Sequence, residues 1–186
     1  MQTLVISGAS RGIGLATARE FAAAGWDVLN IARRPCELDG ARNVAADLSD
    51  PAWIERHGAE VLDALGSSSV VALVHNAALL TSDSVSDVTQ DALRRVLQVN
   101  LLACVQLDQL LLPRMAPGSS IIYVGSTLAE KAVAGSCAYV VSKHALVGLM
   151  RATAQDLAGR GIHSTCVCPG FTDTEMLREH VGTEPE

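Results

Sequence analysis

The hydrophobic positions of the chain form two alternating patterns. Short apolar runs rich in Val, Ile and Leu alternate with longer stretches whose apolar residues recur every three or four positions. The short runs are typical of strands buried on both faces, and the longer stretches are typical of amphipathic helices. The expected strands cover residues 3–7, 27–32, 41–46, 70–74, 119–125 and 162–168. The expected helices cover residues 15–24, 51–65, 86–112 and 139–158.

This alternation predicts an α/β fold with a doubly wound, parallel, Rossmann-like sheet. Ligands bind such sheets at the carboxyl ends of the strands. Gly8, Asn76, Ser126 and Pro169 each come directly after an expected strand. We therefore expect these positions to lie along one edge of the sheet, within a single domain that spans residues 1–186.

A glycine-rich loop, Gly8-Ala-Ser-Arg-Gly-Ile-Gly14, connects the first expected strand to the first expected helix. Glycines here let the backbone approach a pyrophosphate, and the N–H groups at the helix start attract its charge. The spacing Gly-x-x-x-Gly-x-Gly differs from the usual Gly-x-Gly-x-x-Gly, so an ordinary glycine-rich turn is the alternative. The expected dinucleotide contacts are Gly8, Ser10, Arg11, Gly12, Ile13 and Gly14.

Two arginines favour NADP(H) over NAD(H) as the cofactor. In dinucleotide folds an acidic residue after the second strand binds the ribose 2′-hydroxyl, whereas arginine suits a 2′-phosphate. Here the second strand ends at Ala32 and Arg33 follows it, while Arg11 lies in the glycine loop. The alternative is that both arginines are simply solvated.

Tyr139 and Lys143 lie four positions apart at the start of the last expected helix. Residues at this spacing share one helical face. An ammonium beside a phenol favours the phenolate, so the pair can exchange a proton with a substrate oxygen near neutral pH. Ser126, at the end of the fifth strand, can direct its hydroxyl to the same point. Taken alone, Tyr-x-x-x-Lys is also common on solvated helix faces.

Two asparagines have both a functional and a structural interpretation. Asn76 follows the fourth strand, where its amide can bind a ligand or cap the turn. Asn100 falls in the middle of a long helix, where a buried amide needs backbone, water or a site as its partner. The spacing of Asp87 and Gln90 predicts a capping box at the start of that helix, and Pro113 predicts its end.

Composition and charge limit the possible partners. A net charge of −6 and a pI near 5.3 argue against a nucleic-acid surface, because phosphate binding needs clustered Lys and Arg. No apolar run approaches the ~20 residues of a membrane span, and no signal peptide is recognisable, so we expect no membrane partner and a cytoplasmic location. The five cysteines and five histidines show no metal-ligand spacing. Cys166 and Cys168 share one face of the sixth strand, which is typical of a core position.

These motifs together resemble the short-chain dehydrogenase/reductase family, from Thr3 to about Thr174. The glycine loop is similar to the family's Thr-Gly-x-x-x-Gly-x-Gly, with Ser7 in place of threonine. Asn100 falls where the family has its catalytic asparagine. Ser126 precedes Tyr139 by the family's usual 13 positions.

Three further segments resemble the cofactor-binding motifs of the family. Asp47-Leu48 is similar to the pair that contacts adenine, and Pro169-Gly-Phe-Thr-Asp-Thr174 is similar to Pro-Gly-x-x-x-Thr. His75-Asn76-Ala77-Ala78 is similar to Asn-Asn-Ala-Gly but departs from it at the first and last positions. The resemblance implies cofactor contacts from Asp47, Leu48, Asn76, Ala77, Tyr139, Lys143, Pro169, Gly170, Thr172 and Thr174.

The resemblance also implies an oxidoreductase that transfers a hydride between NADP(H) and a small-molecule carbonyl or secondary alcohol. Tyr139 would be the general acid in reduction and the general base in the reverse direction. Lys143 would lower the pKa of the phenol and hydrogen-bond the nicotinamide ribose, and Ser126 would hold the substrate oxygen. Asn100 would fix a water that relays protons to Lys143.

Three expectations concern the whole molecule. Helices 86–112 and 139–158 are apolar on more than one face, and in the family they pair across an interface, which implies a homodimer or homotetramer. Family members generally continue for some tens of residues past this point, so we expect the chain to lack the last strand and the substrate lid. The alternative function is a catalytically weak nucleotide-binding or regulatory member of the same fold.

Overall fold

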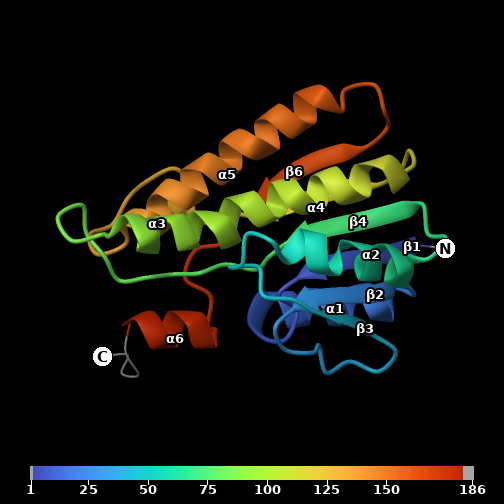
Figure 1. The fold of residues 1–186 in the computed structure, drawn as a ribbon, viewed down its shortest axis with the longest axis horizontal. Helices are drawn as coiled ribbons and strands as arrows, with labels where there is room; N and C mark the ends of the chain where they lie inside the picture. Colours follow the sequence, from blue (N-terminus) through green and yellow to red (C-terminus); the bar gives the residue numbers. More distant parts are fainter. Residues whose placement is uncertain (1, 182–186) are drawn as a thin grey trace.

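The computed structural model describes residues 2–181, and a six-stranded parallel sheet forms its centre (Figure 1). The strand order β3-β2-β1-β4-β5-β6 reverses direction at β1 and β4. Such a reversal is the switch point where doubly wound sheets bind ligands. The predicted fold class is therefore confirmed. The strands are Gln2–Ser7 (β1), Asp27–Ala32 (β2), Arg42–Ala45 (β3), Val70–His75 (β4), Ser120–Val124 (β5) and His163–Val167 (β6).

Helices cover both faces of the sheet. Neighbouring residues of a strand point to opposite faces, so Leu4 and Ile6 of β1 pack with α1, whereas Val5 packs with α2, α4 and α5. This two-sided burial explains why the strand sequences are apolar throughout. The α-helices are Gly12–Ala23 (α1), Trp53–Leu65 (α2), Gln90–Leu97 (α3), Ala103–Leu111 (α4), Cys137–Asp156 (α5) and Glu175–Val181 (α6). Short 3-10 turns are Leu112–Arg114 (η2) and Thr127–Ala129 (η3).

The long helix between β4 and β5 begins later than the sequence predicted. It begins at Gln90, with Thr89 at its N-cap accepting a hydrogen bond of 3.1 Å from the Ala92 N–H. Asp87 instead accepts a hydrogen bond of 2.7 Å from the Ser84 N–H in the preceding turn. The predicted capping box is therefore wrong, because a nearer threonine takes the capping position and the aspartate closes its own turn.

A π-helical turn, Gln98–Leu102 (η1), separates α3 from α4. At its end the Ala103 N–H donates to the carbonyl of Gln98, five residues back. Such turns insert one extra residue into a helix and recur at functional sites. Here the turn contains Asn100, the asparagine that the sequence placed in the middle of a regular helix.

The continuous helical run Gln90–Arg114 is long and apolar enough to span a membrane by length and composition, which the sequence-based expectation did not anticipate. Its apolar residues pack against the sheet instead. Half of its most apolar window is buried inside the fold, and Leu107 and Leu111 belong to the main core. A core helix packed on a sheet needs an apolar stripe of this kind.

A buried polar network joins the sheet to the helices that cover it. His75 Nε2 lies 2.8 Å from Asp108 Oδ1, and the Tyr123 hydroxyl donates to Asp108 Oδ2 at 2.6 Å. The Tyr123 hydroxyl also lies 3.1 Å from that of Thr153. Burial acts to lower the pKa of His75, but Cys104 and the Asp108 carboxylate outweigh burial and raise it to about 10. The network thus links β4 and β5 to α4 and α5.

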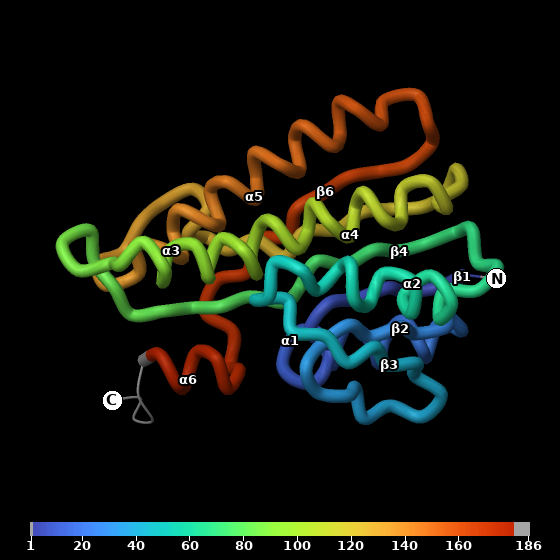
Figure 2. The backbone as a smooth tube through the Cα atoms, viewed as in Figure 1, coloured from blue at the N-terminus to red at the C-terminus, as the bar shows by residue number. Residues whose placement is uncertain are grey.

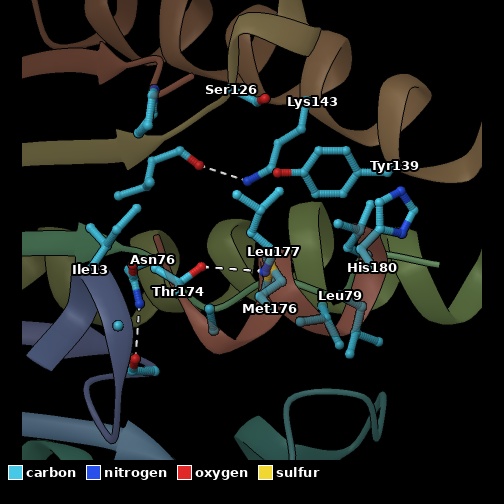
Figure 3. A pocket seen from close by; sticks show the side chains of 18 of the residues that line it. Ile13, Asn76, Leu79, Ser126, Tyr139, Lys143, Thr174, Met176, Leu177 and His180 are labelled. Atoms are coloured by element: carbon cyan, nitrogen blue, oxygen red, sulfur yellow. Dashed lines mark hydrogen bonds between the residues drawn. The ribbon is translucent and has the colours of Figure 1, made fainter. Parts of the chain in front are cut away.

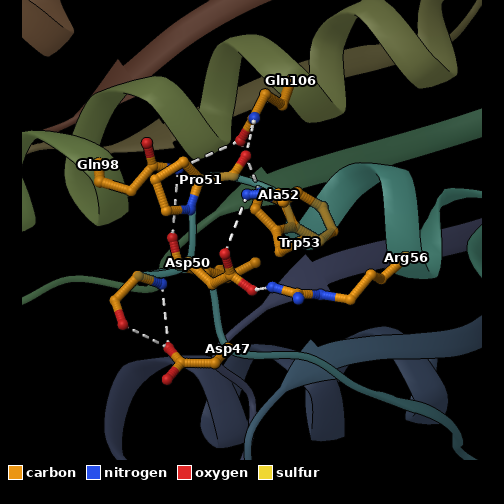
Figure 4. A network of polar contacts seen from close by, with 10 residues as sticks. Asp47, Asp50, Pro51, Ala52, Trp53, Arg56, Gln98 and Gln106 are labelled. Atoms are coloured by element: carbon orange, nitrogen blue, oxygen red, sulfur yellow. Dashed lines mark hydrogen bonds and ion pairs between the residues drawn. The ribbon is translucent and has the colours of Figure 1, made fainter.

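A second polar cluster positions the loop after β3 (Figure 4). The buried Trp53 donates its indole N–H to Gln106 Oε1 at 2.6 Å, and Gln106 Nε2 donates to the Pro51 carbonyl at 3.0 Å. Gln98 Nε2 donates to the Leu48 carbonyl at 3.4 Å. These contacts connect the start of α2 and the loop before it to the long helix. They place Leu48 at the ligand-binding edge of the sheet.

Candidate active site

A cavity of about 650 Å³ lies at the carboxyl ends of the strands (Figure 3). Its lining comes from the segments after all six strands. All but two of the predicted site residues line it. These are Gly8, Ser10, Arg11, Gly12, Ile13, Arg33, Asp47, Leu48, Asn76, Ala77, Ser126, Tyr139, Lys143, Pro169, Gly170, Thr172 and Thr174. The other two, Gly14 and Asn100, are not among the residues that line the cavity.

The glycine loop brings backbone against backbone. A side chain at Gly14 would place its Cβ 2.4 Å from the Gly8 carbonyl oxygen and 2.5 Å from Asn76 Nδ2, so only glycine fits there. Gly8 and Gly12 adopt positive φ values of 75° and 57°, which other residues rarely adopt. Asn76 Nδ2 donates to the carbonyls of Ser7 and Gly8, at 3.1 and 2.9 Å. Asn76 therefore holds the glycine loop in shape.

The N-terminus of α1 is suited to an anion. The N-cap residue, Arg11, makes no capping hydrogen bond with its side chain, and the first turn contains no acidic residue. The partial positive charge of the helix dipole is therefore not neutralised locally. Together with the close-packed glycines, this end of α1 fits the pyrophosphate of a dinucleotide, which Gly12 and Ile13 would hold.

The far end of the cavity carries several charges. Asp47 accepts hydrogen bonds from the Ser49 N–H and hydroxyl, at 3.0 and 2.8 Å. Burial acts to raise the pKa of Asp47, but these bonds and the nearby Arg33 and Arg95 lower it, so the carboxylate is ionised. Arg33 and Arg34 are exposed at the cavity wall, and neither pairs with an acidic side chain within residues 2–181.

Arg11 points toward α6 rather than toward Arg33's end of the cavity. Its Nη1 atom lies 3.2 Å from Glu179 Oε1. The pair is partly solvated, with side-chain exposures of 38% and 66%, so its strength is modest. An arginine engaged in this way has to release Glu179 before it can bind a phosphate, which leaves Arg33 as the better-placed of the two predicted arginines.

Tyr139 and Lys143 lie one turn apart on α5, as their spacing predicts (Figure 3). The Lys143 ammonium lies 5.4 Å from the centre of the Tyr139 ring and donates to the Val124 carbonyl at 2.7 Å. Ser126 follows β5 and accepts a hydrogen bond of 3.1 Å from the Leu128 N–H. One phenol, one ammonium and one hydroxyl thus line the same part of the cavity.

Burial dominates the electrostatics of this group. It raises the pKa of Tyr139, and a hydrogen bond with Ser126 acts in the opposite direction. It lowers the pKa of Lys143 to about 8, against the opposing influence of Cys104, Cys166 and Cys168. The expectation that Lys143 lowers the pKa of the phenol is therefore not met in this arrangement. The phenol is held in its protonated, proton-donating form.

Asn100 does not reach the cavity. Its Oδ1 accepts a hydrogen bond of 2.7 Å from the Leu79 N–H, and its Nδ2 donates to the Leu79 carbonyl and the Ser142 hydroxyl, at 3.0 and 2.9 Å. The amide is thus occupied by protein groups. It fixes the segment after β4 against α5 one residue before Lys143, so its place in the structure is that of a positioning residue.

Sequence reasoning missed α6, which carries Met176, Leu177 and His180 to the cavity (Figure 3). His180 lies 3.3 Å from the Ser82 hydroxyl through Nδ1 and 3.4 Å from the Ser136 hydroxyl through Nε2. Figure 2 shows the helix beyond the ends of the strands, and its side chains line part of the cavity. Its signals were present: Glu175 in the first turn, and Arg178 and His180 in the last, match the helix dipole.

Comparison with known proteins identifies the fold family. The family model for short chain dehydrogenase matches residues 2–185. The chain is 35% identical over 190 residues to 1-deoxy-11-beta-hydroxypentalenate dehydrogenase of Streptomyces exfoliatus, covering 94% of this chain and 68% of that protein.

Solved structures of relatives contain either nicotinamide cofactor. A short chain dehydrogenase from Burkholderia cenocepacia in complex with NADP has a TM-score of 0.83 and 34% identity, covering 93% of this chain and 75% of that one. A 4-hydroxyisoleucine dehydrogenase complexed with NADH has a TM-score of 0.85 and 26% identity, covering 98% and 81%. With the glycine loop, Ser126, Tyr139 and Lys143 gathered at one cavity, the chain belongs to the short-chain dehydrogenase/reductase family of oxidoreductases.

Proposed function

We propose that this protein transfers a hydride between NADP(H) and a small-molecule carbonyl or secondary alcohol, with residues 1–186 acting as one catalytic domain. The observation that carries this proposal is the single cavity that joins the glycine loop to Ser126, Tyr139 and Lys143. A pyrophosphate site and a proton donor that line one cavity match the two tasks of such a reaction.

Each polar group then has a distinct task. The bound cofactor would supply or accept the hydride. Tyr139, kept protonated by burial, donates its proton to the substrate oxygen on which negative charge develops, and takes one back in the reverse direction. Ser126 holds that oxygen by a hydrogen bond. Lys143 orients the ribose end of the cofactor and gives positive charge to the site when protonated.

Preference for NADP(H) rests on the end of β2. The strand ends at Ala32 without an acidic residue, and Arg33 and Arg34 follow it at the cavity wall. A 2′-phosphate there gains charge-assisted hydrogen bonds that a 2′-hydroxyl does not. Arg33→Ala should weaken NADPH binding by about 10-fold and leave NADH binding nearly unchanged. Arg94→Ala, at an exposed arginine outside the cavity, is the matched control.

We place the protein in the cytoplasm and expect a homodimer or homotetramer. Leu102, within the long helix, and Val141, near the start of α5, are apolar side chains that remain 47% and 45% exposed. Burying them against a second copy would remove this surface from water.

The experiment is turnover of a panel of ketones and secondary alcohols with each cofactor, alongside NADPH fluorescence on titration. Tyr139→Phe should reduce turnover by at least ~10²-fold and leave NADPH affinity intact, because the substitution removes only the proton donor. Near-normal turnover by this variant would refute the mechanism. NADPH binding without turnover of any substrate by the native chain would favour the nucleotide-binding alternative.

A further inference from the structure

A pair of cysteines lies directly behind the active site. The Sγ atoms of Cys166, in β6, and Cys168, just after it, are 3.7 Å apart. Cys166 and Cys168 are two positions apart in sequence, and such residues in an extended chain have Cα atoms ~6.5 Å apart, within the ~4.4–6.8 Å range of disulfides. Their Cβ atoms are then farther apart than the ~3.5–4.5 Å that an S–S bond needs. Both side chains are half-buried, whereas Cys36 and Cys104 are fully buried. The sulfurs are already in contact and open enough to meet a small oxidant, and a cross-link between them requires the chain around Val167 to bend out of its extended form.

The two sulfurs pack against Gly125, which separates two parts of the catalytic group. A Cβ atom at Gly125 would lie 2.7 Å from Cys166 Sγ and 2.9 Å from Cys168 Sγ, so the sulfurs fill the space above this glycine. The residue before Gly125 supplies the carbonyl that binds the Lys143 ammonium, and the residue after it is Ser126. The thiols thus contact the backbone that positions both groups.

The same backbone is tied to the segment that carries the thiols. The Gly125 N–H donates to the Val167 carbonyl at 2.8 Å, and the Thr127 N–H donates to the Pro169 carbonyl at 3.0 Å. These two bonds bracket Cys168. A backbone movement of Cys168 toward Cys166 therefore pulls on the end of β5 and on the loop at Pro169, which lines the cavity.

We propose that Cys166 and Cys168 form a reversible disulfide when the protein meets hydrogen peroxide, and that this bond lowers activity by displacing Gly125 and its neighbours. One thiol attacks the peroxide and becomes a sulfenic acid as the O–O bond breaks, releasing water. The second thiol attacks that sulfur, forms the S–S bond and releases a second water. Two thiols are thus oxidised by one peroxide, and a dithiol reductant reverses the change.

The two thiols have different roles in this sequence. Burial and the neighbouring Cys168 raise the pKa of Cys166 to about 11, which keeps it as a poorly nucleophilic thiol. Whichever of the two thiols loses its proton attacks the peroxide, and the other resolves the sulfenic acid. Bond formation brings the sulfurs from 3.7 Å to about 2.05 Å, and the backbone bend that this needs moves the segment packed against Gly125.

The chemical claim is tested without reference to activity. Peroxide treatment of the native chain should lower the number of free thiols from five to three, reduce the intact mass by about 2 Da and yield one cross-linked peptide containing Cys166 and Cys168. Cys168→Ser should abolish the cross-link. Cys137→Ser, at another half-buried cysteine, should retain it. An unchanged thiol count, or a cross-link between other cysteines, would overturn the proposal.

The coupling claim rests on the proposed function and has two readouts. Oxidation should lower turnover at least ~10-fold, because a displacement of about 1 Å in a catalytic group costs up to ~10²-fold, and dithiothreitol should restore it. It should also shift the NMR signal of Lys143, which is measurable even if no substrate is turned over. A disulfide that forms and changes neither quantity would refute the coupling. Loss of turnover in the peroxide-treated Cys168→Ser protein would refute it as well.

Discussion

The buried ammonium of Lys143 leads to a measurable prediction about its titration. The side chain is 2% exposed and makes one protein hydrogen bond, to the Val124 carbonyl. Burial penalises the charged form and lowers the pKa of Lys143 from 10.5 to about 8. Raising the pH of the protein without cofactor should therefore deprotonate Lys143 well before a lysine in water.

The shift corresponds to a free-energy difference of about 3 kcal/mol between the two protonation states, at about 1.4 kcal/mol for each pH unit. In the unfolded chain Lys143 keeps its proton up to about pH 10.4, so the folded state gains stability as the pH rises from about 8 toward that value. His75 acts in the opposite sense. Its raised pKa contributes stability that is complete below ~6.5 and is lost as pH rises through about 10.

Because these contributions oppose each other, the titration has to be read from Lys143 itself. The chain contains only two lysines, so selective ¹³Cε labelling gives one signal from Lys143 and one from the exposed Lys131. Lys143→Arg assigns the first signal by removing it. The expected result is a midpoint near 8 for Lys143. A midpoint at the ordinary lysine value of ~10.4 would refute the claim that burial controls this group.

Two further predictions concern the glycine loop and the buried network. Gly14→Ala should reduce NADPH affinity by at least ~10-fold, because its Cβ would lie 2.4 Å from the Gly8 carbonyl oxygen and distort the glycine loop. Fluorescence titration measures this affinity. An unchanged affinity would contradict the close packing of Gly14 against Gly8. Asp108→Asn should lower the free energy of unfolding by about 3 kcal/mol because it removes the charged partner of His75. Urea unfolding measures this loss, and Asp91→Asn, in an exposed ion pair, should change stability by less than about 0.5 kcal/mol. Equal losses in the two variants would contradict the burial argument.

The strands were predictable because each is buried on both faces. Such strands read as unbroken apolar runs, and every expected strand matches an observed one to within one or two residues at its ends. The glycine loop was predictable for a different reason. Gly8 has a positive φ, and a Cβ at Gly14 would lie 2.4 Å from the Gly8 carbonyl oxygen, so both positions require glycine. The loop is therefore recognisable in the sequence by its glycines.

Features that depend on partners distant in sequence were harder to predict. The spacing of Asp87 and Gln90 fits a capping box, but Thr89 lies closer to the helix start. Asn100 was a recognisable anomaly, yet nothing local indicates that Leu79 and Ser142 occupy its amide. The titration of Tyr139 depends on how deeply the fold buries it, which spacing along a helix does not report.

Charge alone was also an incomplete guide to the cofactor end of the site. Arg11 and Arg33 looked equivalent in sequence. In three dimensions Arg11 pairs with Glu179, 168 positions away, whereas Arg33 has no such partner within the described part of the chain. Short helices such as α6 carry too few apolar positions to show a helical period in the sequence, so only the charged residues in their first and last turns indicate them.

The π-helical turn at Gln98–Leu102 sets the relative rotation of the two halves of the long helix. One residue of α-helix turns the chain by about 100°, so the single added residue reorients everything before it relative to everything after it. A one-residue deletion there would restore the α-helical hydrogen-bond pattern while keeping Leu107 and Leu111 on the sheet. The deletion would rotate the amide of Asn100 away from Leu79. The number of residues in this turn therefore determines how the segment after β4 is held, as much as the side chain of Asn100 does.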